Sequence, residues 1–327
     1  MVTNIGSGTV VILGDACVDM VVKSGRDSKG NEFKARPELN CGGSAANTAM
    51  LLAQLGISVA FVGAVGRDAF GNIVAGSLSA AGVDISKLIQ LDDAYTTVVI
   101  AVVYLDGTHT MKGWPLDGGA DLMLELSHGD ISVFNNPIWL HSTGLSIVKS
   151  PTRETVFRAM RYARSHDISV SFDLNMHGSL GLIDGILEKQ YEYNLREAIK
   201  LSDCVFGSAS DEIALLYPEE NTSQAAISLA GMTRTAISRR GELEAICAVG
   251  SELIESEPFQ VDTVDTIGAG DAFNAGFIAA QLEGLSIEKS LQWGHATAGL
   301  SLKTVGTSGK FDRTDILRLI EQHPRFM

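Results

Sequence analysis

The segment that organises this chain is DTIGAGDAFNAGFIAAQLEG, residues 265–284. Three small residues open its turn: Gly268, Ala269 and Gly270. Asp271 follows them, apolar residues then recur at helical spacing, and Gly284 stands where a helix C-cap glycine is expected. Such a turn leaves backbone N–H groups open at the helix start, and these groups form an anion site with the helix dipole. The alternative is a capped helix that packs through its small residues.

The composition describes a globular protein with a large core. Its 327 residues are 45% hydrophobic and include 34 glycines, so we expect a substantial core and many tight turns. The formal net charge of −14 argues against a nucleic-acid partner, because no basic field is present to neutralise phosphates. An acidic protein that binds anions must use backbone dipoles, metal ions or a few placed cations.

The four cysteines, at positions 17, 41, 204 and 247, form no CxxC pair and have no metal-ligand spacing. Reduced thiols in a cytoplasmic protein are the simplest explanation. The N-terminus, MVTNIGSGTVVILG, has neither a basic region nor a long apolar run, which argues against a signal peptide. No stretch of about 18 apolar residues occurs, so we expect neither a transmembrane helix nor a membrane partner.

Strand and helix patterns alternate along most of the chain. We predict strands at residues 10–13, 59–62, 96–104, 137–141, 168–172, 205–206 and 235–238, with a hairpin turn at Asp106-Gly107. We predict helices at 41–56, 75–81, 151–166, 265–284, 287–302 and 314–322. The alternation indicates an α/β fold with a mainly parallel sheet that is covered by helices on both faces. Two polar segments, about 20–40 and 96–118, do not fit it, and we predict that they form a small β lid on a single domain spanning residues 1–327.

Acids and one amide follow the predicted strands. They are Asp15, Asp19, Asp173 and Asn175, with the segment 208–212 after the next strand. In a parallel sheet, ligands bind at the carboxyl ends of the strands. Acids gathered at one edge indicate bound hydroxyl groups, metal ions or proton transfer, because a buried acid without partners is costly. The four named residues are therefore candidate substrate ligands.

Absent motifs narrow the chemistry. The chain has no GxxxxGK[ST] loop, no HExxH or GxSxG motif and no protein-kinase signature set. Phosphoryl transfer fits what remains, since it needs charge neutralised on the transferred phosphate and a base near the accepting hydroxyl. The N–H groups of Ala269 and Gly270 suit the first task and Asp271 the second. A kinase without a P-loop lysine needs other cations, which implies Mg²⁺ carried in with the nucleotide.

Two motifs then identify a family. DTIGAGDAFNAGF resembles the C-terminal signature of the ribokinase-like (PfkB) carbohydrate kinases, and CGGSAANTAMLLAQLG, residues 41–56, resembles their N-terminal signature. FVGAVGRDAFG at 61–71 and SFDLNMH at 171–177 are similar to further family elements, so the resemblance covers nearly the whole chain. It implies the ribokinase-like three-layer α/β/α fold and ATP as phosphoryl donor.

The resemblance also implies roles for single residues. Asp271 becomes the catalytic base and the turn 268–270 becomes the anion hole. Asp19 would bind sugar hydroxyls together with Gly43 and Asn47 of the first signature. In several members the lid also supports dimerisation, which implies a homodimer through the lid.

A monovalent cation, K⁺, is a further implied cofactor. Asp265 and the carbonyl of Ile267 match the family's cation site beside the anion hole. The weaker candidates are Ser301, Thr304 and Gly306.

The nucleotide side departs from the family pattern. The family's NxxE element keeps Glu212, but alanine occupies position 209, where asparagine is usual. The nucleotide strand has Ser238 where a glycine is usual, followed by Gly241. His295 lies near the expected adenine site, with packing in the core as its alternative.

Other departures concern cations and the sugar. Arg239 and Arg240 are alternatives for phosphate contact, but we predict a solvated turn for them. His177 stands where the family often has an arginine. Ser44 and Cys17 replace a lysine and an asparagine of ribokinase itself, which argues against ribokinase proper.

Three functions remain open. The first is an ATP-dependent kinase that phosphorylates a hydroxymethyl group of a small sugar or sugar acid. The second is a nucleoside kinase of the same family, which the low aromatic content of 6% disfavours because a base pocket needs aromatic walls. The third is a catalytically weak sugar-binding relative, which the altered position 209 favours and the intact turn with Asp271 disfavours.

Overall fold

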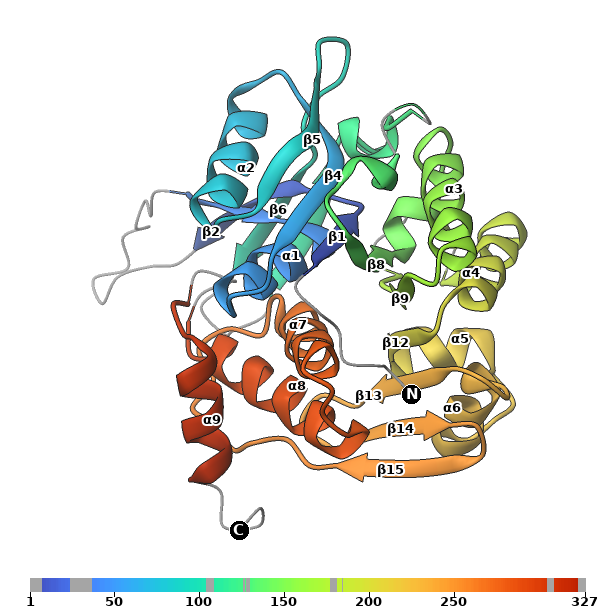
Figure 1. The fold of residues 1–327 in the computed structure, drawn as a ribbon. Coiled ribbons are helices and arrows are strands. Elements are labelled where there is room, and N and C mark those ends of the chain that lie inside the picture. Colours follow the sequence, from blue (N-terminus) through green and yellow to red (C-terminus); the bar gives the residue numbers. More distant parts are fainter. Residues whose placement is uncertain are drawn as a thin grey trace.

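A computed structural model describes residues 8–23, 37–103, 109–125, 127, 130–176, 181–183, 185–304 and 309–322. Its main feature is a nine-stranded sheet (Figure 1). In spatial order the strands are β15 (Glu252–Ser256), β14 (Ala245–Val249), β13 (Thr235–Arg239), β12 (Cys204–Ser208), β9 (Ser169–Asp173), β8 (Pro137–Thr143), β1 (Thr9–Leu13), β4 (Val59–Gly66) and β5 (Asp84–Leu91). All neighbouring strands from β13 to β5 pair in parallel. The pairs β13–β14 and β14–β15 are antiparallel.

Helices cover both faces of this sheet, which confirms the predicted three layers. Successive residues of a strand face opposite sides, so Val10 and Ile12 enter one hydrophobic cluster and Val11 and Leu13 the other. The first cluster is covered by α1 (Ser44–Gln54), α2 (Ala69–Ala80), α7 (Ala269–Leu282), α8 (Ile287–Ser301) and α9 (Arg313–Glu321). The second is covered by α3 (Thr152–Ser165), α4 (Lys189–Leu201), α5 (Ala214–Leu216) and α6 (Thr222–Ala230).

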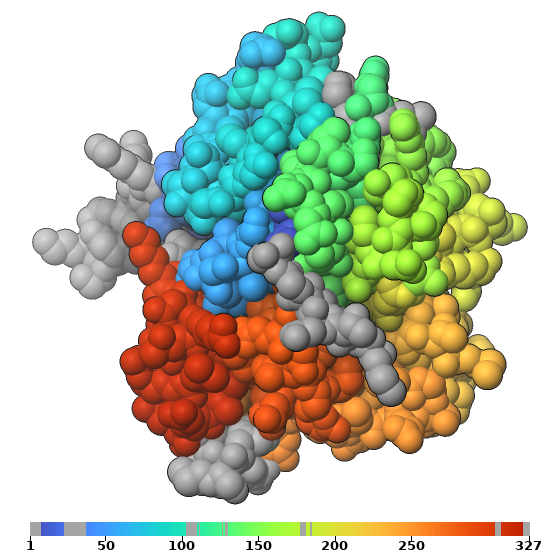
Figure 2. Space-filling model, viewed as in Figure 1, coloured from blue at the N-terminus to red at the C-terminus, as the bar shows by residue number. Residues whose placement is uncertain are grey.

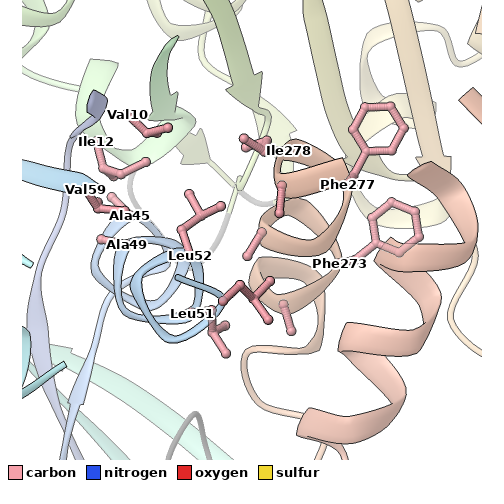
Figure 3. Close-up of a cluster of buried hydrophobic side chains, with 14 of the residues drawn as sticks. Val10, Ile12, Ala45, Ala49, Leu51, Leu52, Val59, Phe273, Phe277 and Ile278 are labelled. Atoms are coloured by element: carbon pink, nitrogen blue, oxygen red, sulfur yellow. The ribbon is translucent and has the colours of Figure 1, made fainter. Parts of the chain in front are cut away.

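Helices α1 and α7 pack against each other over the centre of the sheet. Figure 3 shows Leu51 and Leu52 of α1 beside side chains of α7, with Val10 and Ile12 of β1 above them in this view. Phe277 of α7 meets the ring of Phe206 edge to face, with centroids 5.5 Å apart. The packing sets the N-termini of both helices at the same edge of the sheet.

A second, smaller sheet lies beside the first. It contains β3 (Glu38–Gly42), β2 (Cys17–Lys23), β6 (Val98–Val103) and β7 (His109–Trp114) in that order. The central pair β2–β6 is parallel and the outer pairs are antiparallel. The two predicted lid segments thus supply this small sheet, although β2 already begins at Cys17. The predicted hairpin turn at 106–107 lies outside the described residues.

Several elements differ from the sequence predictions. The helix predicted at 75–81 begins at Ala69, because the Asp68 carboxylate accepts a hydrogen bond from the Gly71 N–H at 2.7 Å and caps it. The further elements that the patterns did not predict include β5, β14, β15, α4, α5, α6 and the short pair β10 (Leu182–Ile183) and β11 (Ile186–Leu187). In the part of the chain that is described, no helix is long and apolar enough to cross a membrane.

Candidate active site

The glycine turn at the start of α7 forms an open helix N-terminus. Gly268 has φ 77°, a left-handed conformation that suits glycine, and no side chain caps the helix. The helix ladder begins with the Ala272 N–H, which donates to the Gly268 carbonyl at 2.9 Å. Asp271 therefore lies in the first helical turn, next to backbone N–H groups that carry the positive end of the dipole.

Two side chains of α1 hold the carboxylate of Asp271. The Ser44 hydroxyl donates to Asp271 Oδ1, and Asn47 Nδ2 donates to Oδ2 at 2.8 Å. A carboxylate oxygen has two lone pairs, so both oxygens keep accepting capacity beyond these bonds. The two family-like signatures meet at this contact, which joins residues more than 200 positions apart in the sequence.

Burial raises the pKa of Asp271 from 3.8 to about 7. The hydrogen bonds from Ser44 and Asn47 act in the opposite direction, while the charge of Asp173 raises the pKa and that of Arg239 lowers it. A carboxyl group with a pKa near neutral is suited to general base catalysis, because it both accepts and releases a proton at physiological pH.

Asp15 fixes the position of α1. Its Oδ2 accepts from the Ser44 N–H at 2.7 Å, and its Oδ1 accepts from the Thr143 hydroxyl at 2.6 Å. Asp15 is buried, and burial raises its pKa. Both of its carboxylate oxygens are thus engaged with the protein, and the residue orients the helix that carries Ser44 and Asn47.

The two glycines before α1 leave room for neighbouring groups. A Cβ on Gly42 would lie 2.3 Å from Asp19 Oδ2. Gly43 has φ 95°, and a Cβ there would lie 2.8 Å from the Ala16 Cα. The paired glycines therefore allow the small sheet and α1 to approach the end of β1 closely.

Two half-buried acids lie where the small sheet meets the large one. Asp19 of β2 accepts a hydrogen bond from the Cys17 thiol, and burial raises its pKa to about 6. Asp121 accepts from the Thr97 hydroxyl at 2.5 Å, and burial raises its pKa to about 6 as well. The charge of Asp15 raises both pKa values, so Asp19 and Asp121 each lie within electrostatic reach of Asp15.

Asp173 is paired with arginine rather than open to a ligand. Arg239 Nη2 donates to Asp173 Oδ1 at 2.8 Å and Nη1 to Oδ2 at 3.0 Å, which makes a bidentate pair. Asn274 Nδ2 also donates to Asp173 Oδ2, at 2.6 Å. Asn175, two residues on, has φ 34°, and its buried Nδ2 has no hydrogen-bond partner among the described residues.

The predicted nucleotide residues lie at the ends of β12 and β13 and in α8. Glu212 is buried and accepts from the N–H groups of Met176 at 2.8 Å and Ser208 at 2.6 Å. Ser238 is buried in β13, and Gly241 takes φ 63° in the turn after it. His295 is also buried: its Nε2 bonds the Ser256 carbonyl at 2.8 Å, and burial lowers its pKa to about 4.

The position of His295 agrees with the alternative interpretation, in which this side chain packs in the core. Its ring meets Phe273 edge to face, with centroids 5.1 Å apart, inside the interface between α7 and α8. A neutral, buried imidazole with a backbone partner is typical of a core residue, and the nucleotide contact of His295 stays a prediction.

The predicted cation residues gather between the glycine turn and the end of α8. Asp265 Oδ1 accepts from the Ile267 N–H at 3.1 Å, and the N–H groups of Val264 and Asp265 donate to the Leu302 carbonyl at 2.7 and 3.3 Å. The Ser301 carbonyl accepts from the Thr304 N–H at 3.2 Å. Gly306 lies outside the described residues. The carbonyl end of a helix and a carboxylate are oxygen donors of the kind that hard cations prefer.

Three residues of this candidate site do not follow from the sequence patterns. The patterns mark Ser44 only as a departure from ribokinase, predict a solvated turn for Arg239 and give no role to Asp121. Arg239 is in fact the last residue of β13, and its side chain is only 16% exposed. Its position after a predicted strand was the available signal, since that is where this fold places ligands. Asp121 follows no strand, so no local signal existed for it.

Comparisons with known proteins show the family of this chain. The family model for "pfkB family carbohydrate kinase" matches residues 8–313. A fructokinase of Salmonella typhimurium is 32% identical over 277 residues, or 83% of each chain. A 5-dehydro-2-deoxygluconokinase of Bacillus subtilis is 25% identical over 295 residues, or 89% of each chain.

A solved structure has the same fold. It is a double mutant of the Vibrio cholerae O395 fructokinase in its fructose-, ADP- and potassium-bound form, with a TM-score of 0.77, 24% identity and coverage of 96% of this chain and 98% of that one. The family model spans nearly the whole sequence, and the Salmonella relative matches over most of it. This chain therefore belongs to the pfkB family of carbohydrate kinases.

Proposed function

We propose that this kinase transfers the γ-phosphoryl group of ATP to a hydroxymethyl group of a small sugar or sugar acid. The observation that carries the proposal is Asp271, a carboxylate that two side chains of α1 hold in the first turn of an uncapped helix. The family match supports the reaction class, and the fructokinase structure with fructose and ADP supports the kind of ligands.

Asp271 would act as the base. As the acceptor oxygen bonds to the γ-phosphorus and the bond to the leaving ADP breaks, its carboxylate takes the hydroxyl proton. Ser44 and Asn47 orient the carboxylate, and the N–H groups of the turn 268–270 stabilise charge on the transferred group.

The acceptor would lie between α1 and the small sheet. Asp19 and Asp121 offer carboxyl groups for sugar hydroxyls there, and Gly42, the residue before Gly43, lies against Asp19. Acids in this position favour a neutral sugar over an acceptor that itself carries a carboxylate, because like charges repel. A sugar acid remains the second candidate, since one relative is named 5-dehydro-2-deoxygluconokinase.

Mg²⁺ would enter with ATP. Among the described residues no group of three or more His, Cys, Asp or Glu side chains could hold a metal ion, so there is no dedicated cage. That fits Mg²⁺, which keeps water ligands and binds through substrate phosphates with one or two carboxylates. Asp211 and Glu212 would be those carboxylates, and the ion would neutralise phosphate charge.

K⁺ is the second proposed ion. Asp265, Ile267, Ser301 and Thr304 would hold it beside the anion hole. The solved fructokinase in its potassium-bound form supports K⁺ as the ion. Bound there, it would add positive charge near the turn 268–270.

The small sheet also suits a homodimer. Met20, Leu39 and Ile100 are cross-strand neighbours on one face, whereas Asp19 is on the other. Leu39 and Ile100 are 41% and 37% exposed. We further place the protein in the cytoplasm, which the four buried free thiols support.

Asp271→Asn tests the base. We expect kcat to fall by about 10³-fold, the usual scale for losing a general base, while the acceptor still raises the melting temperature. The folded pKa of Asp271 is raised, so its ionisation destabilises the native state as pH rises toward 7, and the variant should melt no lower than the parent at pH 8. Exposed Asp262→Asn is the matched control.

The acceptor is identified in the same assay. Fructose, 5-dehydro-2-deoxygluconate and adenosine are compared in potassium and in sodium chloride, with a nonhydrolysable ATP analogue for the melting measurements. Near-parental turnover in Asp271→Asn would refute the base. A melting shift with adenosine alone would replace the sugar by a nucleoside.

A further inference from the structure

We propose that Arg239 is a positioning residue for phosphoryl transfer, whose guanidinium group ties the first turn of α7 to the end of β9 and fixes the peptide that carries the base. The inference rests on the proposed function, since it concerns the same base and turn. It assigns a role to a side chain that sequence patterns place in a solvated turn.

The guanidinium group touches three structural elements at once. Its Nη1 donates to the Gly270 carbonyl at 3.0 Å and to Asn274 Oδ1 at 2.9 Å, both on α7. The bidentate pair with Asp173 joins it to β9, and Nη2 lies 3.8 Å from Glu212 Oε2 beyond β12. The partners converge from distant parts of the sequence, so one side chain sets their spacing.

Most of the donors of Arg239 are already used by the protein. A guanidinium group has five N–H donors. The two on Nη1 are shared among Asp173, Gly270 and Asn274, and Nη2 donates to Asp173. A side chain with three of its five donors engaged in this way holds these elements together, and turning the Nη1 edge toward a phosphate would require it to release existing partners.

The glycine at position 270 makes room for this arrangement. A Cβ on Gly270 would lie 2.9 Å from Arg239 Nη1, closer than real Cβ contacts. The carbonyl that Arg239 bonds is that of Gly270, the residue directly before Asp271. The contact therefore fixes the peptide plane from which the base extends.

The charges around Asp271 give the arrangement a measurable signature. Asp173 of β9 raises the pKa of Asp271 and Arg239 of β13 lowers it. The α1 face contributes only the uncharged Ser44 and Asn47. The further acids are Asp15, whose carboxylate bonds the Ser44 N–H, and Glu212, 3.8 Å from Arg239. Removing Arg239 and removing Asp173 should thus move the pKa of the base in opposite directions.

The experiment compares two single variants and their double variant, each of which removes a charge near Asp271, by the pH dependence of kcat/KM. In Arg239→Met we expect kcat to fall at least tenfold and the acidic midpoint of kcat/KM to rise by about half a unit or more, as expected when a nearby opposite charge is lost. Asp173→Asn should lower the midpoint, and the double variant should return it near the parental value. Arg239→Lys should keep the parental midpoint of kcat/KM and retain more of kcat than Arg239→Met does. Lysine keeps the positive charge but cannot make the bidentate contacts of a guanidinium group.

Arg240→Met is the matched control. Arg240 is the neighbouring arginine, and its Nη1 pairs with Glu244 at 2.6 Å in the turn after β13. Its profile should equal that of the parent. An unchanged midpoint in folded Arg239→Met, or shifts of the same sign in the two single variants, would overturn the proposal. If Arg239→Met does not fold, the test rests on Asp173→Asn. A lower acidic midpoint of kcat/KM in that variant supports the proposal, and an unchanged or higher midpoint overturns it.

A second measurement separates this inference from the proposed function. The Asp271 carboxyl pKa is followed by carbon NMR of aspartate-labelled protein, assigned by difference with Asp271→Asn. This readout needs no substrate. A midpoint that moves in the predicted directions supports the role of Arg239 even if no sugar is phosphorylated, whereas turnover without movement refutes it and leaves the proposed function standing.

Discussion

At the residue scale, Asp271 combines a poor environment for charge with the contacts a base requires. Burial raises its pKa to about 7, while Ser44 and Asn47 stabilise the ionised form. Desolvation outweighs these bonds, and the result is a group that is half ionised near neutral pH. The sequence predicted Asp271 itself from the glycine turn, but not its pKa, which depends on neighbours from α1 and β9 that only the folded chain brings together.

The pH dependence of the reaction follows from this value. A base works in its ionised form, so kcat/KM should fall about tenfold per pH unit below about pH 7 and level off above it. Initial rates between pH 5.5 and 8.5 with a non-ionising acceptor check this. A rate that stays flat down to pH 5.5 would show that the base has an ordinary carboxyl pKa.

At the scale of elements, α7 owes its position to its small residues. A Cβ on Gly276 would lie 2.3 Å from Thr297 Oγ1 and 2.5 Å from the Trp293 carbonyl of α8. Glycine at this point lets the two helices approach closely. The helix therefore packs through small residues, as the alternative interpretation of this segment has it, but its N-terminus is open rather than capped by a side chain.

Gly276→Val tests the close approach. Overpacking of this kind costs about 1–3 kcal/mol, so the urea midpoint should fall and α7 should shift at the active site, which lowers kcat as well. Gly76→Ala in α2 is the matched control, since nothing lies within 4 Å of a Cβ there. It should leave stability unchanged or raise it by about 0.5–1 kcal/mol. Equal midpoints in the two variants would contradict close packing.

Sequence patterns predicted some of the helices and strands but not others. Long apolar runs and glycine turns predicted the central parallel strands, α1, α7 and α8. The pair β14–β15 was not predicted, because antiparallel pairing at a sheet edge depends on partners rather than on a local period. Strand β5 was missed because its residues are only partly buried and alternate weakly.

At the scale of the whole molecule, the site joins the two ends of the sequence. Figure 2 shows the blue N-terminal segment directly against the orange and red C-terminal helices. The two signatures could be recognised separately, whereas the pairing of Ser44 and Asn47 with Asp271 could not, since no local pattern reports contacts between such distant segments.

The proposed dimer is tested at this scale. Ile100→Lys places a second cation beside Lys112, its partner in β7, on the partly apolar face of the small sheet. We expect the variant to elute as a monomer in size exclusion with light scattering while the parent elutes as a dimer, because a buried unpaired charge opposes association. Exposed Ile183→Lys, on the distant β10, is the control. A monomeric parent would end the proposal.

The close approach of Gly270 to Arg239 has a consequence for related sequences. Since a Cβ at 270 and a guanidinium group at 239 compete for the same space, the two positions should co-vary: a larger residue at 270 should accompany a shorter one at 239. A substitution at either position alone breaks the arrangement, and a second at the other partly restores it. The third residue of the glycine turn is thus half of a pair, with the other half about 30 residues away.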